Sequence, residues 1–313
     1  MNKIKKSLQI FSIIFNIIVL ALILLLFYLI QPIKTEKIIY IEQGSITKII
    51  TQLAKDNVNI TPPIDKYIIR FLGYPQAGWI DMRETLLTKA DYLYNLSHAK
   101  AAVNDITLIP GETAYVFLQQ ISTKLDLSFE LLYKYFSELS PYEDGWLVPD
   151  TYHIPIGISE EKLIKYLIDE STKYHIKLSN ELLGEYNEKE WLRILTIASI
   201  TQKEAANNNE MPLVSSVIYN RLKINMKLQM DGTLNYGKYS HIRVTPTMIR
   251  EDVSKYNTYL HYGIPPNPIC AVNKSAIKAA IFPAETGYLY FVKKNDNEHF
   301  FTYTYEEHLK KIK

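Results

Sequence analysis

An uncharged, apolar segment near the N-terminus constrains the fold of this chain more than any other feature. Residues 7–33 contain no charged side chain, and residues 10–30 within them are almost continuously apolar. A helix needs about 20 such residues to cross the hydrocarbon layer of a bilayer. The sequence therefore predicts one membrane-spanning helix, with residues 1–34 forming a short cytoplasmic tip and a transmembrane signal anchor.

The charges that precede this segment predict its orientation. Lys3, Lys5 and Lys6 lie directly before it, and positive charge is retained on the cytoplasmic side of a membrane. A cleaved signal peptide is the alternative, but its apolar region typically spans about 7–15 residues and ends in a small-x-small site, which residues 29–32 do not offer. We expect a single-pass protein of the cytoplasmic (inner) membrane, with residues 34–313 on its periplasmic, extracytoplasmic side.

Composition argues against several classes of function. The formal net charge is only +2, and no dense basic stripe is present, so nucleic acid is not an expected partner. The single cysteine, Cys270, cannot form an intramolecular disulfide or a thiolate zinc cluster. The seven histidines show no metalloprotease-type spacing. We expect neither a metal ion nor another cofactor, and we expect Cys270 to be a buried apolar residue.

The pattern of the exported chain predicts an α+β protein. Residues 38–41 resemble a strand and residues 46–54 a helix, with a Gly44 turn between them, and a further helix is expected over 83–96. A strand, a glycine turn and a helix in this order are similar to small glycan-binding modules of the lysin-motif type. We expect a lysin-motif-like α+β module over 35–105 and a larger mixed α+β domain over 106–313.

The strongest helix pattern of the chain covers residues 190–206. Ile197, Ile200 and Glu204 fall on one face of this helix, so the carboxyl group shares an apolar environment. Burial disfavours the charged form of a carboxyl group and raises its pKa. Glu204 is therefore a candidate general acid, although a partly exposed carboxylate paired with Lys203 or Arg221 would give the same pattern.

One motif lies on this helix and several more follow it in a defined order, and a hairpin of two strands is predicted near the C-terminus. Together they closely resemble the endolytic murein transglycosylases, single-pass proteins with a lysin-motif-like region and a C-terminal catalytic domain. The resemblance covers the exported chain and is densest over 194–304; the motifs are Ala198–Glu204, Val217–Leu222, Met226–Asp231, Tyr256–Tyr259, Gly263–Cys270, Tyr288–Val292 and His299.

The resemblance assigns the catalytic role to Glu204, since the family carries its catalytic glutamate in an Ala-Ser-Ile-x-x-Lys-Glu helix. Two departures stand nearby, because Gln202 replaces a second glutamate and Gly232 replaces a proline. The first narrows the catalytic prediction to Glu204, and the second leaves the geometry of the following loop open. The candidate substrate-binding residues are Glu210, Gln229, Asp231, Tyr256, Asn257 and His299, of which His299 could also relay protons.

The implied activity is cleavage of the MurNAc–GlcNAc bond in peptidoglycan, leaving 1,6-anhydro-MurNAc ends and terminating or trimming nascent glycan strands. The implied partners are peptidoglycan strands and the membrane, with peptidoglycan synthases (penicillin-binding proteins) and the elongation and division machinery as candidates. Two alternatives stay open: a muramidase that hydrolyses the same bond with water, and a non-catalytic, membrane-tethered scaffold that binds glycan and recruits synthases.

Overall fold

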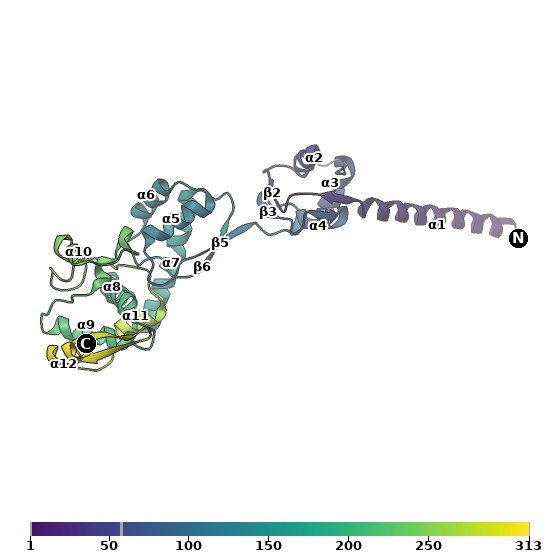
Figure 1. The fold of residues 1–313 in the computed structure, drawn as a ribbon. Coiled ribbons are helices and arrows are strands. Elements are labelled where there is room, and N and C mark those ends of the chain that lie inside the picture. The colour runs from purple at the N-terminus through teal and green to yellow at the C-terminus, as the bar shows by residue number, and fades with distance from the viewer. Residues whose placement is uncertain (1, 57–58, 313) are drawn as a thin grey trace. The chain divides into compact units, whose positions relative to one another are not determined.

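The contacts within the chain divide it into two compact units (Figure 1). This computed structural model describes residues 2–56 and 59–312. The first unit comprises Met1–Asn104 with Pro155–Gly157, and the second comprises Asp105–Ile154 with Ile158–Lys313. Both units contain helices and short antiparallel strand pairs, so the predicted α+β class is confirmed.

The first unit begins with the long apolar helix α1 (Asn2–Leu29). Its apolar part, Lys6–Leu29, has the length and composition required to cross a bilayer, and residues 6–27 of it are exposed, with only the last turn packed against the protein. A helix that is apolar on all sides and exposed over most of its length cannot be the core helix of a globular unit. The prediction of a long apolar N-terminal helix is therefore confirmed.

The rest of the first unit, over its described residues, is a small module of two strand pairs and three helices. The strands pair antiparallel as β1 with β4 and β2 with β3, and an isoleucine core lies between them and the helices. The bounds are β1 (Pro32–Lys34), β2 (Ile38–Ile41), α2 (Ile46–Asp56), α3 (Pro62–Leu72), β3 (Gly78–Asp81), β4 (Leu86–Thr88) and α4 (Lys89–His98).

The predicted helix over 83–96 was wrong in its first part. Residues 86–88 form strand β4, where Leu87 is buried opposite Ile33, and α4 begins only at Lys89. The Thr88 side chain caps the new helix by accepting a hydrogen bond from the Asp91 amide at 3.1 Å. Pairing with a distant strand and a strong N-cap together overrode the local helix pattern.

A buried charged cluster joins the end of α1 to this module. Lys89 and Asp65 are fully buried, and the Lys89 Nζ lies 3.8 Å from the Asp65 Oδ2. The Tyr28 hydroxyl donates to the other carboxylate oxygen at 2.7 Å, and its ring lies 3.6 Å below the ammonium. Asp65 therefore links the last turn of α1 to α3 and α4.

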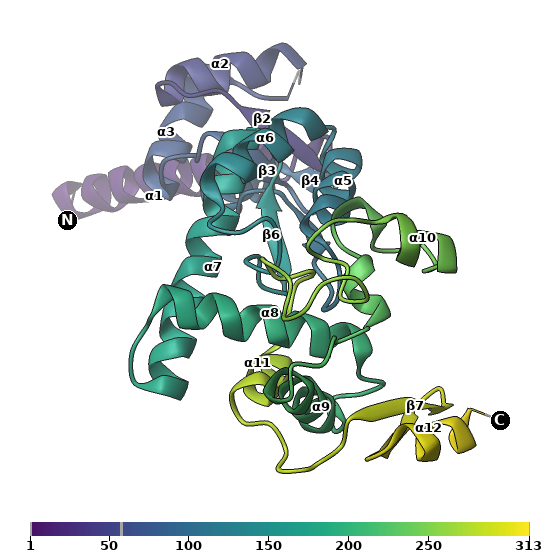
Figure 2. The ribbon, with the colours of Figure 1, turned by 90° about the vertical axis from the view of Figure 1, so that its left-hand side faces the viewer.

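The second unit is mainly helical and holds the larger core of the protein. Helices α8, α9 and α11 pack against one another near its centre (Figure 2). The chain passes between the two units within the strands β5 (Val103–Thr107) and β6 (Thr151–Pro155). The other elements of the second unit are α5 (Ala114–Leu125), α6 (Phe129–Leu139), α7 (Glu160–Leu183), α8 (Glu188–Glu204), α9 (Met211–Lys223), the short 3-10 helices η1 (Asp231–Leu234) and η2 (Gly237–Tyr239), α10 (Pro246–Glu251), α11 (Lys274–Ile281), β7 (Tyr290–Asn295), β8 (Glu298–Thr302) and α12 (Tyr305–Lys311).

The expected C-terminal hairpin is present as β7 and β8, which form their own two-stranded sheet. The hairpin is tied to the loop after α8, because the Asn207 side chain donates to the Asn297 carbonyl at 2.7 Å. Cys270 is fully buried, as expected. The fold thus brings the end of α8, the hairpin and the loop around η1 together.

Candidate active site

Glu204 is the last residue of α8. The helix ends there because Ala205 has an extended backbone, and its amide still closes the last turn onto the Thr201 carbonyl. Ile197 and Ile200 are fully buried on the same helix, while the Glu204 side chain is partly buried. A carboxyl group in this position is anchored by the core at its base and is open to solvent on one side.

The Glu204 carboxyl group is held by a backbone amide from the loop that follows α9. The Gly232 N–H donates to the Glu204 Oε1 at 2.7 Å. A Cβ atom at position 232 would lie 2.9 Å from this oxygen and 2.8 Å from the Lys203 Cβ. Glycine therefore lets the backbone approach the carboxyl group more closely than any other residue would.

Burial raises the pKa of Glu204 to about 7. The hydrogen bond from Gly232 opposes this rise, because it stabilises the carboxylate form. The negative charge of Asp231 adds to the rise, and the positive charges of His299 and Arg221 reduce it. The expected increase in pKa is therefore present, and Glu204 can hold a proton near neutral pH.

Glu210 and His299 form a pair beside this helix end. The His299 backbone amide donates to the Glu210 Oε1 at 2.7 Å, and the His299 Nδ1 lies 2.8 Å from the Oε2. Both side chains are largely buried, and the His299 ring also meets the edge of Phe291. The carboxylate thus fixes both the hairpin and the orientation of the imidazole ring.

Asp231 and Gln229 lie on the loop that carries Gly232. The Tyr259 hydroxyl donates to the Asp231 Oδ1 at 2.6 Å, and the aspartate is exposed. Gln229 is also exposed and has a left-handed backbone with φ 48°, while its amide donates to the Thr258 carbonyl at 3.2 Å. Both residues therefore present polar side chains to solvent, and the charge of Asp231 acts on Glu204.

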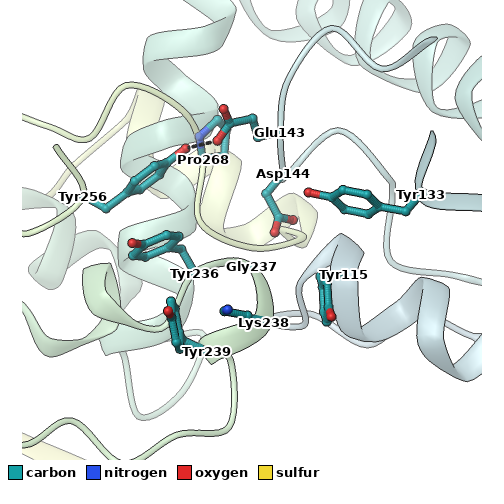
Figure 3. A pocket seen from close by; sticks show the side chains of 10 residues that line it. All are labelled: Tyr115, Tyr133, Glu143, Asp144, Tyr236, Gly237, Lys238, Tyr239, Tyr256 and Pro268. Carbon is teal, nitrogen blue, oxygen red and sulfur yellow. Dashed lines mark hydrogen bonds between the residues drawn. The ribbon is translucent and has the colours of Figure 1, made fainter. Parts of the chain in front are cut away.

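Tyr256 and Asn257 are adjacent in sequence but have different environments, and neither contacts Glu204. Asn257 is fully buried, and its side-chain amide donates to the Ile249 and Asp252 carbonyls at 2.8 and 2.7 Å. We therefore replace its predicted substrate-binding role with a structural one. Tyr256 lines a separate cavity beside Asp144, where its hydroxyl donates to the Glu143 Oε2 at 2.8 Å (Figure 3).

Arg221 and Tyr259 lie close enough to Glu204 to interact with it electrostatically, and neither was among the predicted site residues. Arg221 is buried, and its guanidinium donates to the Leu289 carbonyl at 2.7 Å and to the Leu228 carbonyl. It thereby ties α9 to the loop before η1 and to the segment that leads into β7. Its position within the Val217–Leu222 motif was the available signal.

Gln202 faces away from this site. Its side-chain oxygen accepts a hydrogen bond from the Asn273 amide at 3.2 Å, at the start of α11. A neutral amide is sufficient for this contact, which agrees with Gln202 having no acid function. Glu204 thus remains the candidate proton carrier of this helix, with Asp231 and Tyr259 beside it.

Comparison with known proteins gives consistent results. The YceG-like family matches residues 39–313. The endolytic murein transglycosylase of Bacillus subtilis (strain 168) is 30% identical over 304 residues, which cover 88% of this chain and 84% of that protein. The endolytic murein transglycosylase of Streptococcus pneumoniae (serotype 2, strain D39) is 32% identical over 164 residues, which cover 48% of this chain but only 28% of that longer protein. A crystal structure of a putative yceG-like protein from Listeria monocytogenes has a TM-score of 0.58 and 25% identity, and covers 88% of this chain and 99% of that one.

Proposed function

Because the chain belongs to the YceG-like family, we propose that it is a lytic transglycosylase that cleaves peptidoglycan strands at the MurNAc–GlcNAc bond. The observation that carries the proposal is the partly buried Glu204 carboxyl group, with a pKa of about 7, at the family's motif. Release of anhydro-muropeptides from sacculi by the purified full chain tests it. Sacculi left intact by a folded protein would favour the non-catalytic scaffold instead.

One residue can serve both halves of this reaction. Protonated Glu204 donates its proton to the glycosidic oxygen as the bond from that oxygen to C1 of muramic acid breaks. The C6 oxygen of the same sugar then bonds to C1, and its proton returns to the Glu204 carboxylate. No water is consumed, whereas a muramidase would add water at C1. Between the two steps the Gly232 amide stabilises the carboxylate, since it donates directly to it.

The residues around Glu204 support this chemistry in distinct ways. Asp231, held by Tyr259, is placed to stabilise positive charge on the sugar in the transition state. Gln229 offers an exposed amide for sugar hydroxyl groups. Glu210 acts through His299, whose ring it orients, and we assign both to positioning of the site and its charge. Tyr256 lies apart from these residues, in the lining of the cavity beside Asp144.

We further propose that α1 is an uncleaved, single-pass anchor and that residues 34–313 lie outside the cytoplasm. The module over 35–105 would add affinity for glycan as a lysin-motif-like unit, and the domain over 106–313 would carry the chemistry. Anchoring would place the site at nascent strands beside the membrane, close to peptidoglycan synthases. A reporter that is active only after export, fused to the C-terminus, should be active and remain in the membrane fraction. Recovery of a soluble, shortened protein would show that the segment is a cleaved signal peptide.

The proposed acid role predicts a pH dependence. Cleavage begins from protonated Glu204, and its raised pKa of about 7 keeps this form populated near neutrality. As pH rises above about 7 the protonated fraction falls, so the rate should fall roughly tenfold per pH unit. Initial rates of anhydro-muropeptide release between pH 5 and pH 9 measure this fall of the rate. A rate that stays constant from pH 6 to pH 9 in folded protein would contradict the acid assignment.

The hydrogen bond from the Gly232 amide predicts how the fall of the rate at alkaline pH can be shifted. Substitution Gly232→Pro removes the N–H that stabilises the Glu204 carboxylate, so the pKa of Glu204 should rise. A hydrogen bond to a charged group contributes about 1.5–3 kcal/mol, which corresponds to roughly one to two pH units. The alkaline limb of the rate profile should move to higher pH by about that amount.

Gly232→Ala is the matched control for this experiment. It adds the same Cβ atom near Glu204 and Lys203 but keeps the N–H. Crowding by the Cβ atom is common to the two variants, whereas only Gly232→Pro loses the N–H, whose place beside Glu204 is taken by the ring Cδ atom. If the rate of both variants fell at the same alkaline pH, or if that of Gly232→Pro fell at a lower pH, the amide would be excluded as the group that sets the pKa of Glu204.

A further inference from the structure

A cavity lies beside Asp144, in the same unit as Glu204. It has a volume of about 230 Å³, slightly below the roughly 300 Å³ at which small-molecule sites usually begin. Tyr115 and Tyr133 form one side, and Tyr236 and Tyr239 lie opposite, with Asp144 between them (Figure 3). The full lining is Tyr115, Tyr133, Glu143, Asp144, Tyr236, Gly237, Lys238, Tyr239, Tyr256 and Pro268.

Asp144 is a buried carboxyl group with one oxygen left for a ligand. It is 5% exposed, and its Oδ1 accepts hydrogen bonds from the Ala114 amide at 3.1 Å and the Gly145 amide at 2.8 Å. Among the described residues no hydrogen bond reaches its Oδ2, and Figure 3 shows the carboxyl group turned toward the cavity. Two backbone donors thus fix the group so that its free oxygen points into the space.

The aromatic walls are held in place before any ligand binds. Tyr236 and Tyr256 stack with ring centroids 4.3 Å apart, and the Tyr236 hydroxyl donates to Asp252 at 3.2 Å. On the other side, Tyr115 meets the edge of Tyr133 at 5.8 Å. A rigid site loses less conformational entropy on binding. The flat faces of tyrosine rings suit the C–H faces of sugars, and their hydroxyl groups suit polar edges.

The charges around the cavity favour an uncharged ligand. Burial raises the pKa of Asp144 to about 7, so its negative charge is weakened near neutrality. One Glu143 oxygen is already occupied by the Tyr256 hydroxyl, and Lys238 adds a positive charge to the same lining. A cation would meet Lys238, and an anion would meet the two carboxyl groups. A neutral molecule with hydroxyl and amide groups and apolar faces meets neither difficulty.

The cavity and Glu204 are connected by one short stretch of chain. Gly232 donates to Glu204, and Gly237 and Tyr239 line the cavity. The five residue-to-residue steps from Gly232 to Gly237 can span at most about 18 Å. The Lys203 Nζ also donates to the Ser240 hydroxyl at 3.1 Å, which holds the far end of this segment against α8. A strand bound at Glu204 therefore needs only a few sugars to reach the cavity.

We propose that the cavity beside Asp144 is a binding subsite for one N-acetylated sugar of the glycan strand, a few sugars from the cleaved bond. The identification of the ligand as part of a peptidoglycan strand rests on the proposed function, but the affinity for a neutral amino sugar does not. The Asp144 Oδ2 would accept from a hydroxyl or amide of that sugar, and Tyr115 and Tyr133 would cover one ring face.

Binding of the chitin tetrasaccharide to the full-length Glu204→Gln protein in detergent tests the subsite without cleavage. Ligand-observed nuclear magnetic resonance titration gives the dissociation constant. Adding Tyr133→Ala removes one ring from the cavity and should weaken binding about three- to tenfold. Tyr166→Ala on α7 is the matched control, because Tyr166 is 40% exposed where Tyr133 is 44% exposed, and it is not part of the lining. It should leave the dissociation constant unchanged.

Two outcomes would overturn the subsite. One is equal tetrasaccharide affinity for the Tyr133→Ala and Tyr166→Ala proteins. The other is displacement of the sugar by a lysine-containing tetrapeptide whose own binding depends on Tyr133, which would mark a cation site. Since the assay measures binding alone, failure of the subsite is distinct from failure of the proposed function. If the protein bound the sugar through Tyr133 but left sacculi intact, the subsite proposal would stand and the lytic transglycosylase activity would be excluded.

Discussion

Replacing Glu204 by glutamine should lower the rate of anhydro-muropeptide release by at least about 10²–10⁴-fold, the range typical for loss of general acid–base catalysis. Glutamine has nearly the same size and can still accept the Gly232 hydrogen bond. It cannot donate an acidic proton to the leaving oxygen or recover one from the C6 hydroxyl. Because one residue would serve both steps, we expect the loss to lie at or beyond the upper end of this range.

The thermal stability of the Glu204→Gln variant distinguishes a catalytic role of Glu204 from a structural one. The pKa of Glu204 is raised, so the folded protein favours its neutral form, and the carboxylate lowers stability as pH rises through about 7. Glu204→Gln should therefore unfold at the same or a higher temperature than the parent at pH 8. The same exchange at Glu210, a residue already paired with His299, should have a smaller effect on rate. A fully active, normally folded Glu204→Gln protein would exclude the assignment.

The second large effect should come from Asp65 in the first unit. Replacing it by alanine leaves the fully buried Lys89 ammonium without its ion-pair partner and removes the acceptor of the Tyr28 hydroxyl and the Thr61 amide. Removing one member of a buried pair costs about 3–5 kcal/mol. Thermal unfolding and hydrogen exchange of residues 32–98 in the full chain measure this loss.

A double substitution shows whether the buried charge causes the loss. Asp65→Leu with Lys89→Met replaces both charges by apolar side chains, and such exchanges are often neutral or stabilising. It should recover most of the stability lost in Asp65→Ala. Burial also lowers the pKa of Lys89, so the single variant should regain stability as pH rises and the neutral amine becomes accessible. A double variant as unstable as Asp65→Ala would show that another contact of Asp65 matters more.

Helix periodicity was sufficient to predict the environment of Glu204. The residue lies on the face of Ile197 and Ile200, which are fully buried, and its pKa is raised by burial as expected. The same reasoning could not find Gly232 as its partner, because that contact joins residues 28 positions apart. The burial of Lys89, by contrast, could not be predicted, since no periodic pattern indicates that a lysine will be fully buried.

Adjacent motif residues cannot be separated by sequence alone when a loop turns between them. Asn257 was predicted to bind sugar, yet it is buried and holds its own loop, whereas Tyr259 reaches Asp231 beside Glu204. The pair formed by Glu210 and His299 spans 89 residues and depends on docking of the hairpin. The predicted helix over 83–96 failed for a related reason, because β1 pairs with residues 86–88.

The most direct test of the proposed activity is mass spectrometry of the products formed from sacculi in ¹⁸O-labelled water. Intramolecular attack by the C6 oxygen predicts new muramic acid ends that are one water lighter than hydrolysis products and carry no ¹⁸O. The Glu204→Gln protein should yield none of these ends. Reducing muramic acid ends that contain ¹⁸O would identify a hydrolase and contradict the lyase, and anhydro ends formed equally by Glu204→Gln would contradict the role of Glu204.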